Sequence, residues 1–200
     1  MLVNHIHKFL FVHIQKTAGL SITDSLMQIA GTQSLGYQHS FINLLDLHQY
    51  SGYFKFCFVR NPYDRLVSWY NMMINHGVDN DFSRYMMKGR NFSEFLDRTE
   101  IIYEADPKEK ANGEYPKSIA FNQLDYITDR EGKIAVDFIG RFENLENDFR
   151  LICLRLDIPF RLGHKNKYNH SGYRTYYKTN DIEKVQKLYE RDLEYFKYTF

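Results

Sequence analysis

The feature that most constrains this chain is a short apolar run that passes directly into a turn carrying a lysine and a glycine. The run covers residues 9–14, the turn covers residues 15–19, and Ile22, Leu26 and Ile29 then recur at helical spacing. A strand, a tight turn and a helix in this order leave the first backbone N–H groups of the helix unpaired, at the positive end of its dipole. Because such a helix start binds phosphate groups, the segment predicts an anion site.

The spacing inside the turn separates two kinds of phosphate-binding loop. The P-loop of ATPases and GTPases reads G-x-x-x-x-G-K-[ST] and wraps a triphosphate. Here Lys16 precedes Gly19, and no Gly-Lys-Ser/Thr occurs in the segment. The shorter turn predicts a grip on one 5′-phosphate through backbone N–H groups and the hydroxyls of Thr17 and Ser21, with Lys16 reaching the departing oxygen.

A second unit of the same kind follows. The apolar run of residues 54–59 ends at Arg60-Asn61-Pro62, where asparagine is a favoured N-cap and proline a favoured first helical residue. A helix is therefore expected from Pro62, with Ser68 two turns along it. An arginine fork and a hydroxyl in this arrangement can bind a second phosphate.

These two segments together resemble a known family. Residues 12–19 and 58–70 look like the 5′- and 3′-phosphate motifs of sulfotransferases that use 3′-phosphoadenosine 5′-phosphosulfate (PAPS). The most similar branch is the carbohydrate type (sulfotransferase family 2), related to the heparan 2-O- and 6-O-sulfotransferases. Residues 138–149 and 164–200 are similar to its late strand and helix and to its C-terminal segment, so the resemblance covers nearly the whole chain. One departure is Ala18, where many members carry glycine; we expect it to be tolerated because a methyl group is small.

The resemblance implies a donor site, an acceptor and a mechanism. It implies transfer of a sulfuryl group from PAPS to a hydroxyl of a carbohydrate or glycan-like acceptor, with 3′-phosphoadenosine 5′-phosphate (PAP) as product and no metal. Lys16 is expected to stabilise the leaving phosphate, and His39 is expected to be the general base because an imidazole titrates near neutrality. The residues expected to bind the cofactor are Lys16, Thr17, Ala18, Gly19, Leu20, Ser21, Arg60, Ser68, Lys167 and Tyr173.

Other interpretations of these residues exist. His39 follows Gly36, Tyr37 and Gln38, where a second short strand is expected to end, and it could instead cap a short helix across residues 41–47. Lys16 could be a solvated turn lysine, and Arg60 could be an ion-pair partner. At the level of the whole protein, the alternatives are a P-loop-type nucleotide kinase, which the position of Lys16 disfavours, and a nucleotide-binding module without catalysis.

Three further histidines lie near the N-terminus. His5, His7 and His13 alternate like strand residues. The chain has no H-E-x-x-H motif and no cysteine pair at ligand spacing. We therefore assign these histidines to the face of a strand rather than to a metal. Cys57 and Cys153 lie in apolar patterns and are expected to be buried free thiols.

Composition and pattern indicate one domain over residues 1–200. The chain is 44% hydrophobic, enough for a sizeable core, and strands alternate with helices, which predicts an α/β fold: a three-layer P-loop-like sandwich with a mainly parallel central sheet flanked by helices. A net charge of +1 argues against a protein that coats nucleic acid or another polyanion. No signal peptide and no run of about 18 apolar residues is seen, so we expect a cytoplasmic protein without a membrane span.

Three more helices and a loop complete the prediction. The apolar stripes of residues 145–156 and 182–196 predict helices, and another helix is expected from Ser93, with that serine as its N-cap. Residues 104–117 are charged and contain Pro107, Gly113 and Pro116. They predict an exposed loop that could border the acceptor cleft.

Overall fold

The computed structural model describes residues 1–76, 81–86, 91–104, 119–163 and 172–200. Except for residue 104, the expected loop at 104–117 lies outside the described residues. The predicted ligand Lys167 also lies outside them. The chain divides into two compact units. The first contains residues 1–60 and 123–167, and the second contains residues 61–122 and 168–200. Each unit is described by itself.

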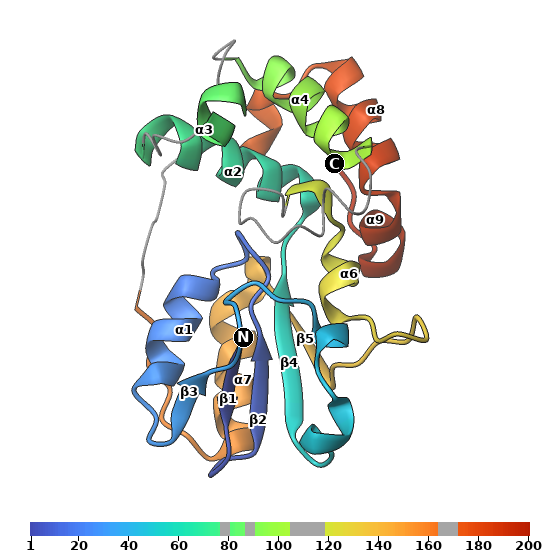
Figure 1. Cartoon of the computed structure of the whole chain (residues 1–200). Coiled ribbons are helices and arrows are strands. Elements are labelled where there is room, and N and C mark those ends of the chain that lie inside the picture. The colour runs from blue at the N-terminus through green and yellow to red at the C-terminus, as the bar shows by residue number, and fades with distance from the viewer. Residues whose placement is uncertain (77–80, 87–90, 105–118, 164–171) are drawn as a thin grey trace. The chain divides into compact units, whose positions relative to one another are not determined.

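The first unit is built on a five-stranded sheet with the order β3-β1-β2-β4-β5 (Figure 1). Strand β1 (Leu2–Asn4) is antiparallel to both β2 (Phe9–Val12) and β3 (Thr32–Ser34). Strand β4 (Phe54–Val59) is parallel to β2, and β5 (Phe138–Arg141) is parallel to β4. All strands except β1 thus share one direction, which confirms the predicted α/β fold with a mainly parallel sheet.

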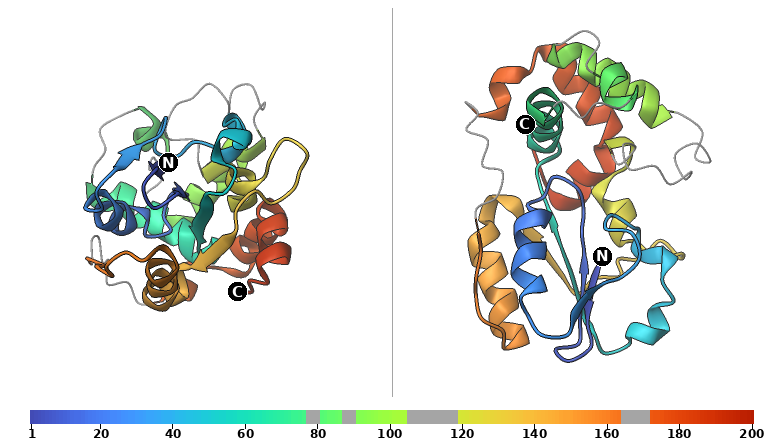
Figure 2. Two further views of the ribbon diagram at one scale, coloured as in Figure 1. Left: turned by 90° about the horizontal axis from the view of Figure 1, so that it is seen from below. Right: turned by 60° about the vertical axis from the view of Figure 1, so that its left-hand side comes forward.

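Helices cover both faces of this sheet, which makes the first unit three-layered. Helices α1 (Gly19–Met27) and α7 (Leu145–Leu156) lie on one face, and α6 (Gln123–Ile127) lies on the other with two 3₁₀ helices (Figure 2, right). The α1 and α7 face is filled by apolar side chains that alternate along the strands. These buried residues include Phe9, Phe11, Ile22, Leu26, Phe56, Phe58, Phe149 and Ile152.

The short helix expected across residues 41–47 is instead two 3₁₀ turns, η1 (Ile42–Leu44) and η2 (Leu47–Tyr50). Asp46 separates them, because its side chain accepts a hydrogen bond from the backbone N–H of His48. An aspartate that binds a nearby backbone N–H competes with a continuing helix and starts a new one.

The register of the parallel strands positions the functional residues. Val12 of β2 pairs with Cys57 of β4, so the two strands end at the same edge of the sheet. The turn after β2 and Arg60 after β4 therefore meet at the carboxyl ends of neighbouring strands, which is where α/β proteins bind ligands.

The second unit is helical. It contains α2 (Pro62–His76), α3 (Asp81–Met86), α4 (Phe92–Glu104), the 3₁₀ helix η5 (Tyr173–Tyr176), α8 (Thr179–Leu188) and α9 (Glu190–Phe196). As predicted, Asn61 caps α2: its side-chain oxygen accepts from the backbone N–H of Tyr63 at 3.1 Å. In the described ranges, no helix combines the length and the apolar character that crossing a membrane requires.

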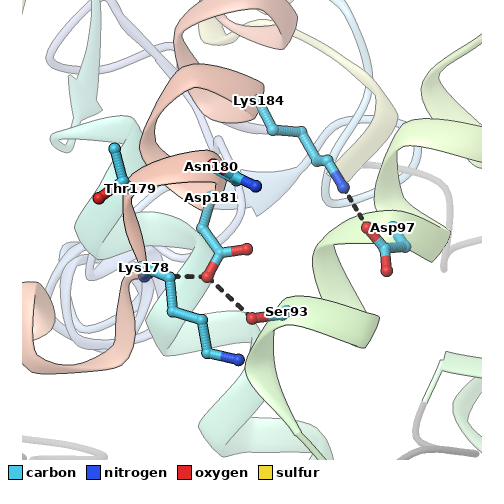
Figure 3. A pocket seen from close by; sticks show the side chains of 7 residues that line it. All are labelled: Ser93, Asp97, Lys178, Thr179, Asn180, Asp181 and Lys184. Carbon is cyan, nitrogen blue, oxygen red and sulfur yellow. Dashed lines mark hydrogen bonds and ion pairs between the residues drawn. The ribbon is translucent and has the colours of Figure 1, made fainter.

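The prediction that Ser93 caps α4 is wrong, because its side chain has another partner. Asn91, rather than Ser93, accepts the backbone N–H of Glu94, at 3.0 Å. The Ser93 hydroxyl donates instead to the Asp181 carboxylate at 2.9 Å, and the backbone N–H of Lys178 donates to the same oxygen at 3.0 Å (Figure 3). Asp181 is buried, so this carboxylate caps α8 and ties it to α4.

Candidate active site

The turn after β2 has the conformation of an anion-binding loop. Lys16 and Ala18 both have positive φ, at 67° and 66°, which curls the backbone before α1 begins at Gly19. The Thr17 hydroxyl donates to the Ile14 carbonyl at 2.9 Å and closes the turn. Consecutive backbone N–H groups around left-handed residues, followed by a helix start, form a concave site for an anion.

Ala18 departs from glycine at a costly position. We expected its methyl group to be tolerated for its size, but the structure shows that conformation is the relevant term. A left-handed backbone costs a residue with a Cβ about 1–2 kcal/mol. The turn at Ala18 (φ 66°) is therefore held in place against local strain.

Gly19 is required for a different reason. It has no positive φ in the structure, but a Cβ built on it would lie 1.8 Å from Nε2 and 2.0 Å from Cδ2 of His13. The ring of His13 is 3% exposed and cannot swing away as a flexible chain end would. The glycine thus makes room for an imidazole that packs directly on the first residue of α1.

These two neighbouring positions give opposite predictions. Gly19→Ala should lower the free energy of unfolding by about 1–3 kcal/mol, the range for overpacking a filled site. Ala18→Gly should keep or raise it, because relief of the left-handed strain offsets the extra chain entropy of glycine. Urea denaturation of both variants measures the two changes. Equal losses at both positions would contradict this account of the turn.

Arg60 lies against this turn. Its guanidinium is stacked over the ring of Phe142 at 3.9 Å, and Nη1 donates to the carbonyl oxygen of Lys16 at 3.3 Å. The side-chain amide of Gln123 fixes the backbone of Arg60 from both sides: it accepts from the N–H and donates to the carbonyl, each at 2.9 Å. The arginine is therefore buried and oriented before any ligand arrives.

Two cationic side chains thus share one buried corner. Burial and the charge of Arg60 lower the pKa of Lys16 to about 8. A lysine held near a second cation is stabilised in its charged form when an anion binds beside it. The lowered pKa and the partial burial of Lys16 distinguish it from a solvated turn lysine.

His39 lies on a loop and not at the end of a strand. Strand β3 ends at Ser34, earlier than expected. The alternative role as a helix cap is also wrong, because Phe41 precedes η1 and no side chain caps it. Instead, Nδ1 of His39 lies 3.1 Å from the backbone oxygen of His13. A carbonyl oxygen only accepts, so Nδ1 carries a proton, and whenever the ring is neutral its lone pair is on Nε2.

His13 is the residue that sequence reasoning missed. Its ring centroid is 4.4 Å from that of His39, edge to face at 75°. Nδ1 of His13 accepts from the side-chain amide of Gln38 at 3.0 Å. Burial, together with the charges of His39 and the N-terminal amine, lowers the pKa of His13 well below its usual 6.5, so this imidazole stays neutral.

The remaining predicted residues are distributed over both units. Leu20, in the first turn of α1, is 48% exposed, whereas Ser21 is buried. Ser68 lies on α2 in the second unit and is buried there. Tyr173 opens η5 in the second unit, and its hydroxyl accepts from the Asn61 side chain at 3.3 Å. The residues that the first unit brings together are the turn Lys16–Ser21, Arg60 and, through His13, the base candidate His39.

Other reactive groups do not join this site. Cys57 and Cys153 are buried free thiols, as predicted. Burial raises the pKa of both and brings that of Cys153 to about 11. Across residues 1–76, 81–86, 91–104, 119–163 and 172–200, no group of three or more His, Cys, Asp or Glu side chains is placed to hold a metal ion.

Comparison with known proteins identifies the family of this chain. The sequence model of one family, described as the sulfotransferase family, matches residues 1–199. The chain is 26% identical to carbohydrate sulfotransferase 14 of Danio rerio over 191 residues, which cover 80% of this chain and 48% of that protein. It is 32% identical over 115 residues to an uncharacterized protein of Archaeoglobus fulgidus, covering 56% of this chain and 75% of the relative. This chain thus spans about half the length of the zebrafish protein, and no solved structure matches it significantly.

Proposed function

Because this chain belongs to the sulfotransferase family, we propose that it transfers the sulfuryl group of PAPS to a hydroxyl of a carbohydrate or glycan-like acceptor. The observation that carries the donor half of this proposal is the corner where the strained turn and the start of α1 meet two cations, the half-buried Lys16 and the buried Arg60. The acceptor class rests on the resemblance to the carbohydrate branch and on the name of the Danio rerio relative.

The donor would be held at both of its phosphate ends. The backbone N–H groups of the turn and of the α1 start, from Lys16 to Ser21, would bind the 5′-phosphosulfate. Arg60, with Ser68, would bind the 3′-phosphate, since a guanidinium pairs strongly with phosphate oxygens. Lys167 and Tyr173 would contribute from the C-terminal segment. The Thr17 hydroxyl would have to exchange its bond to the Ile14 carbonyl for one to phosphate.

The chemistry proposed is an in-line displacement at sulfur. Nε2 of His39 takes the proton of the acceptor hydroxyl, and the oxygen attacks sulfur as the bond from sulfur to the 5′-phosphate oxygen breaks. The ammonium of Lys16 stabilises the charge that develops on the departing phosphate oxygen. The products are the sulfate ester and PAP, with the proton left on His39.

Calorimetric titration with PAP is the test of the donor assignment. PAP should bind without a metal and more tightly than ADP with magnesium. Arg60→Ala should weaken PAP by about 2 kcal/mol or more, roughly 30-fold, as expected for a charge-assisted contact. A preference for ADP with magnesium would favour a kinase instead. PAP binding without sulfuryl transfer to any acceptor in a sugar panel would favour a module that lacks catalysis.

The affinity for PAP should fall as the pH rises. The pKa of Lys16 is about 8 in the unliganded protein, and a bound phosphate raises it, so binding above that pH requires the uptake of a proton. The dissociation constant should increase about tenfold between pH 7 and pH 9 by linkage. Titrations across this range measure the change, and Lys16→Met should remove it. A constant affinity in the wild type would show that Lys16 does not face the ligand.

A further inference from the structure

The His13 imidazole connects two parts of the site that are far apart in the sequence. On one side, the ring packs against Gly19, the first residue of α1, so closely that a Cβ there would lie within 2.0 Å of Nε2 and Cδ2. The start of this helix faces the proposed donor. On the other side, its ring meets the His39 ring at 4.4 Å. One buried ring therefore spans the space between the anion site and the base candidate.

Contacts from Phe11, Gln38 and Thr23 also hold the position of this ring. Phe11 stacks on it with centroids 5.7 Å apart at 24°. The Gln38 side-chain amide donates to Nδ1 at 3.0 Å, and the Thr23 hydroxyl lies 3.4 Å from the same atom. An amide nitrogen only donates, so Nδ1 of His13 accepts and its proton is on Nε2. His13 is thus an oriented, neutral spacer.

The same residue also determines the proton position on its neighbour. The backbone carbonyl of His13 receives Nδ1–H of His39 at 3.1 Å. That bond leaves the lone pair of His39 on Nε2, the nitrogen assigned to the acceptor proton. A histidine whose ring is held and whose second nitrogen is bonded to a carbonyl is committed to one tautomer.

We propose that His13 is a positioning residue: its ring sets the distance between the Gly19 turn and His39, and thereby keeps His39 placed so that its Nδ1–H donates to the backbone carbonyl of His13. This inference rests on the proposed function for its role in catalysis. Its structural content, the tautomer and the ring contact, is independent of that function. The Gly19 turn and His39 are therefore connected through contacts of the His13 side chain.

Two variants separate the ring of His13 from its hydrogen bond. His13→Asn keeps an acceptor for Gln38 but removes most of the ring, whereas His13→Phe keeps a ring and removes the acceptor. We expect His13→Asn to lower kcat by up to about 100-fold, the effect of a misplacement near 1 Å, with little change in the dissociation constant for PAP. We expect His13→Phe to recover most of that loss. Ile152→Ala, a core substitution on α7 of the same unit, controls for lost stability.

The tautomer of His39 gives a readout that needs no activity. Nitrogen-15 NMR of the imidazole should show a single Nδ1–H form in the wild type and in His13→Phe, and a mixture of tautomers in His13→Asn. Gly19→Ala should also cost less stability in the His13→Asn background, because the ring it collides with is gone.

Clear outcomes would overturn the proposal. These are an Nε2–H tautomer of His39 in the wild type, or a His13→Asn variant with unchanged tautomer and unchanged kcat. A kcat loss in His13→Asn no larger than that of Ile152→Ala would do the same. If His13→Asn does not fold, a His13→Phe variant with a mixed tautomer or a strongly reduced kcat would also reject the spacer role. If the wild type transfers no sulfuryl group, the NMR result still tests the positioning, while the proposed function fails by itself.

Discussion

Replacement of His39 by alanine should lower kcat by about 10²–10⁴-fold, the usual contribution of a general base, while the dissociation constant for PAP stays within about twofold. The reason is that His39 and the proposed donor-binding turn have separate roles. His39 is held by a bond to the carbonyl of His13 and lies outside the turn that would bind the donor. Its removal would take away the proposed proton acceptor and leave the proposed phosphate corner intact.

Turnover and PAP binding measured on the same preparation check this prediction. His48→Ala is the matched control, since His48 lies in η2 of the same unit and is exposed. A His39→Ala variant with wild-type turnover would remove His39 as the base. A variant that loses PAP affinity as strongly as turnover would indicate that the residue supports the donor site instead.

Lys16→Met should lower kcat by about 10²–10³-fold, the loss seen when one preorganised donor to a developing oxyanion is removed. The same substitution should stabilise the unliganded protein near neutral pH. The charged form of Lys16 is disfavoured in the fold, because burial and Arg60 lower its pKa to about 8. At a pH below that value the folded protein must keep a half-buried cation beside Arg60, a cost that methionine avoids.

This pairing of lost activity with gained stability distinguishes a functional lysine from a structural one. Steady-state kinetics and urea unfolding, both near pH 7, measure the two effects. Lys55→Met serves as the control: Lys55 forms an ion pair with Asp137 at 3.5 Å, so its loss should affect stability and leave kcat unchanged. A destabilised Lys16→Met variant with normal kcat would contradict both halves of the prediction.

The elements that the sequence predicted well are those with a long apolar pattern or a strong local signal. Strand β2 is a continuous apolar run, β4 is apolar except for Lys55, and Asn61 with Pro62 starts α2 as expected. Strand β1 could not be predicted from periodicity, because it has three residues and its pairing with β2 and β3 depends on partners distant in the fold. The two turns in place of one helix at residues 42–50 depended on a single side chain, Asp46.

The sequence suggested which residues form the proposed site, but it did not reveal the packing of His13 inside it. The order of Lys16, Gly19 and Arg60 along the chain predicts an anion corner, and that assignment stays a proposal. The alternation of His5, His7 and His13 pointed to a strand face, whereas His13 follows the end of β2 and packs on Gly19 and His39. A signal existed in principle: a glycine at a helix start without positive φ implies that something large is packed against it. Recognising that large group requires the three-dimensional structure.

The lowered pKa of Lys16 has a chemical consequence beyond binding. With a pKa of about 8, its amine is about half unprotonated at pH 8, when an ordinary lysine is almost fully protonated. A neutral amine is a nucleophile, so a small acylating reagent at that pH should modify Lys16 ahead of the exposed lysines. Occupation of the corner by PAP should suppress this labelling. The proposed donor site would then contain a reactive amine, and peptide mass mapping would identify the labelled residue directly.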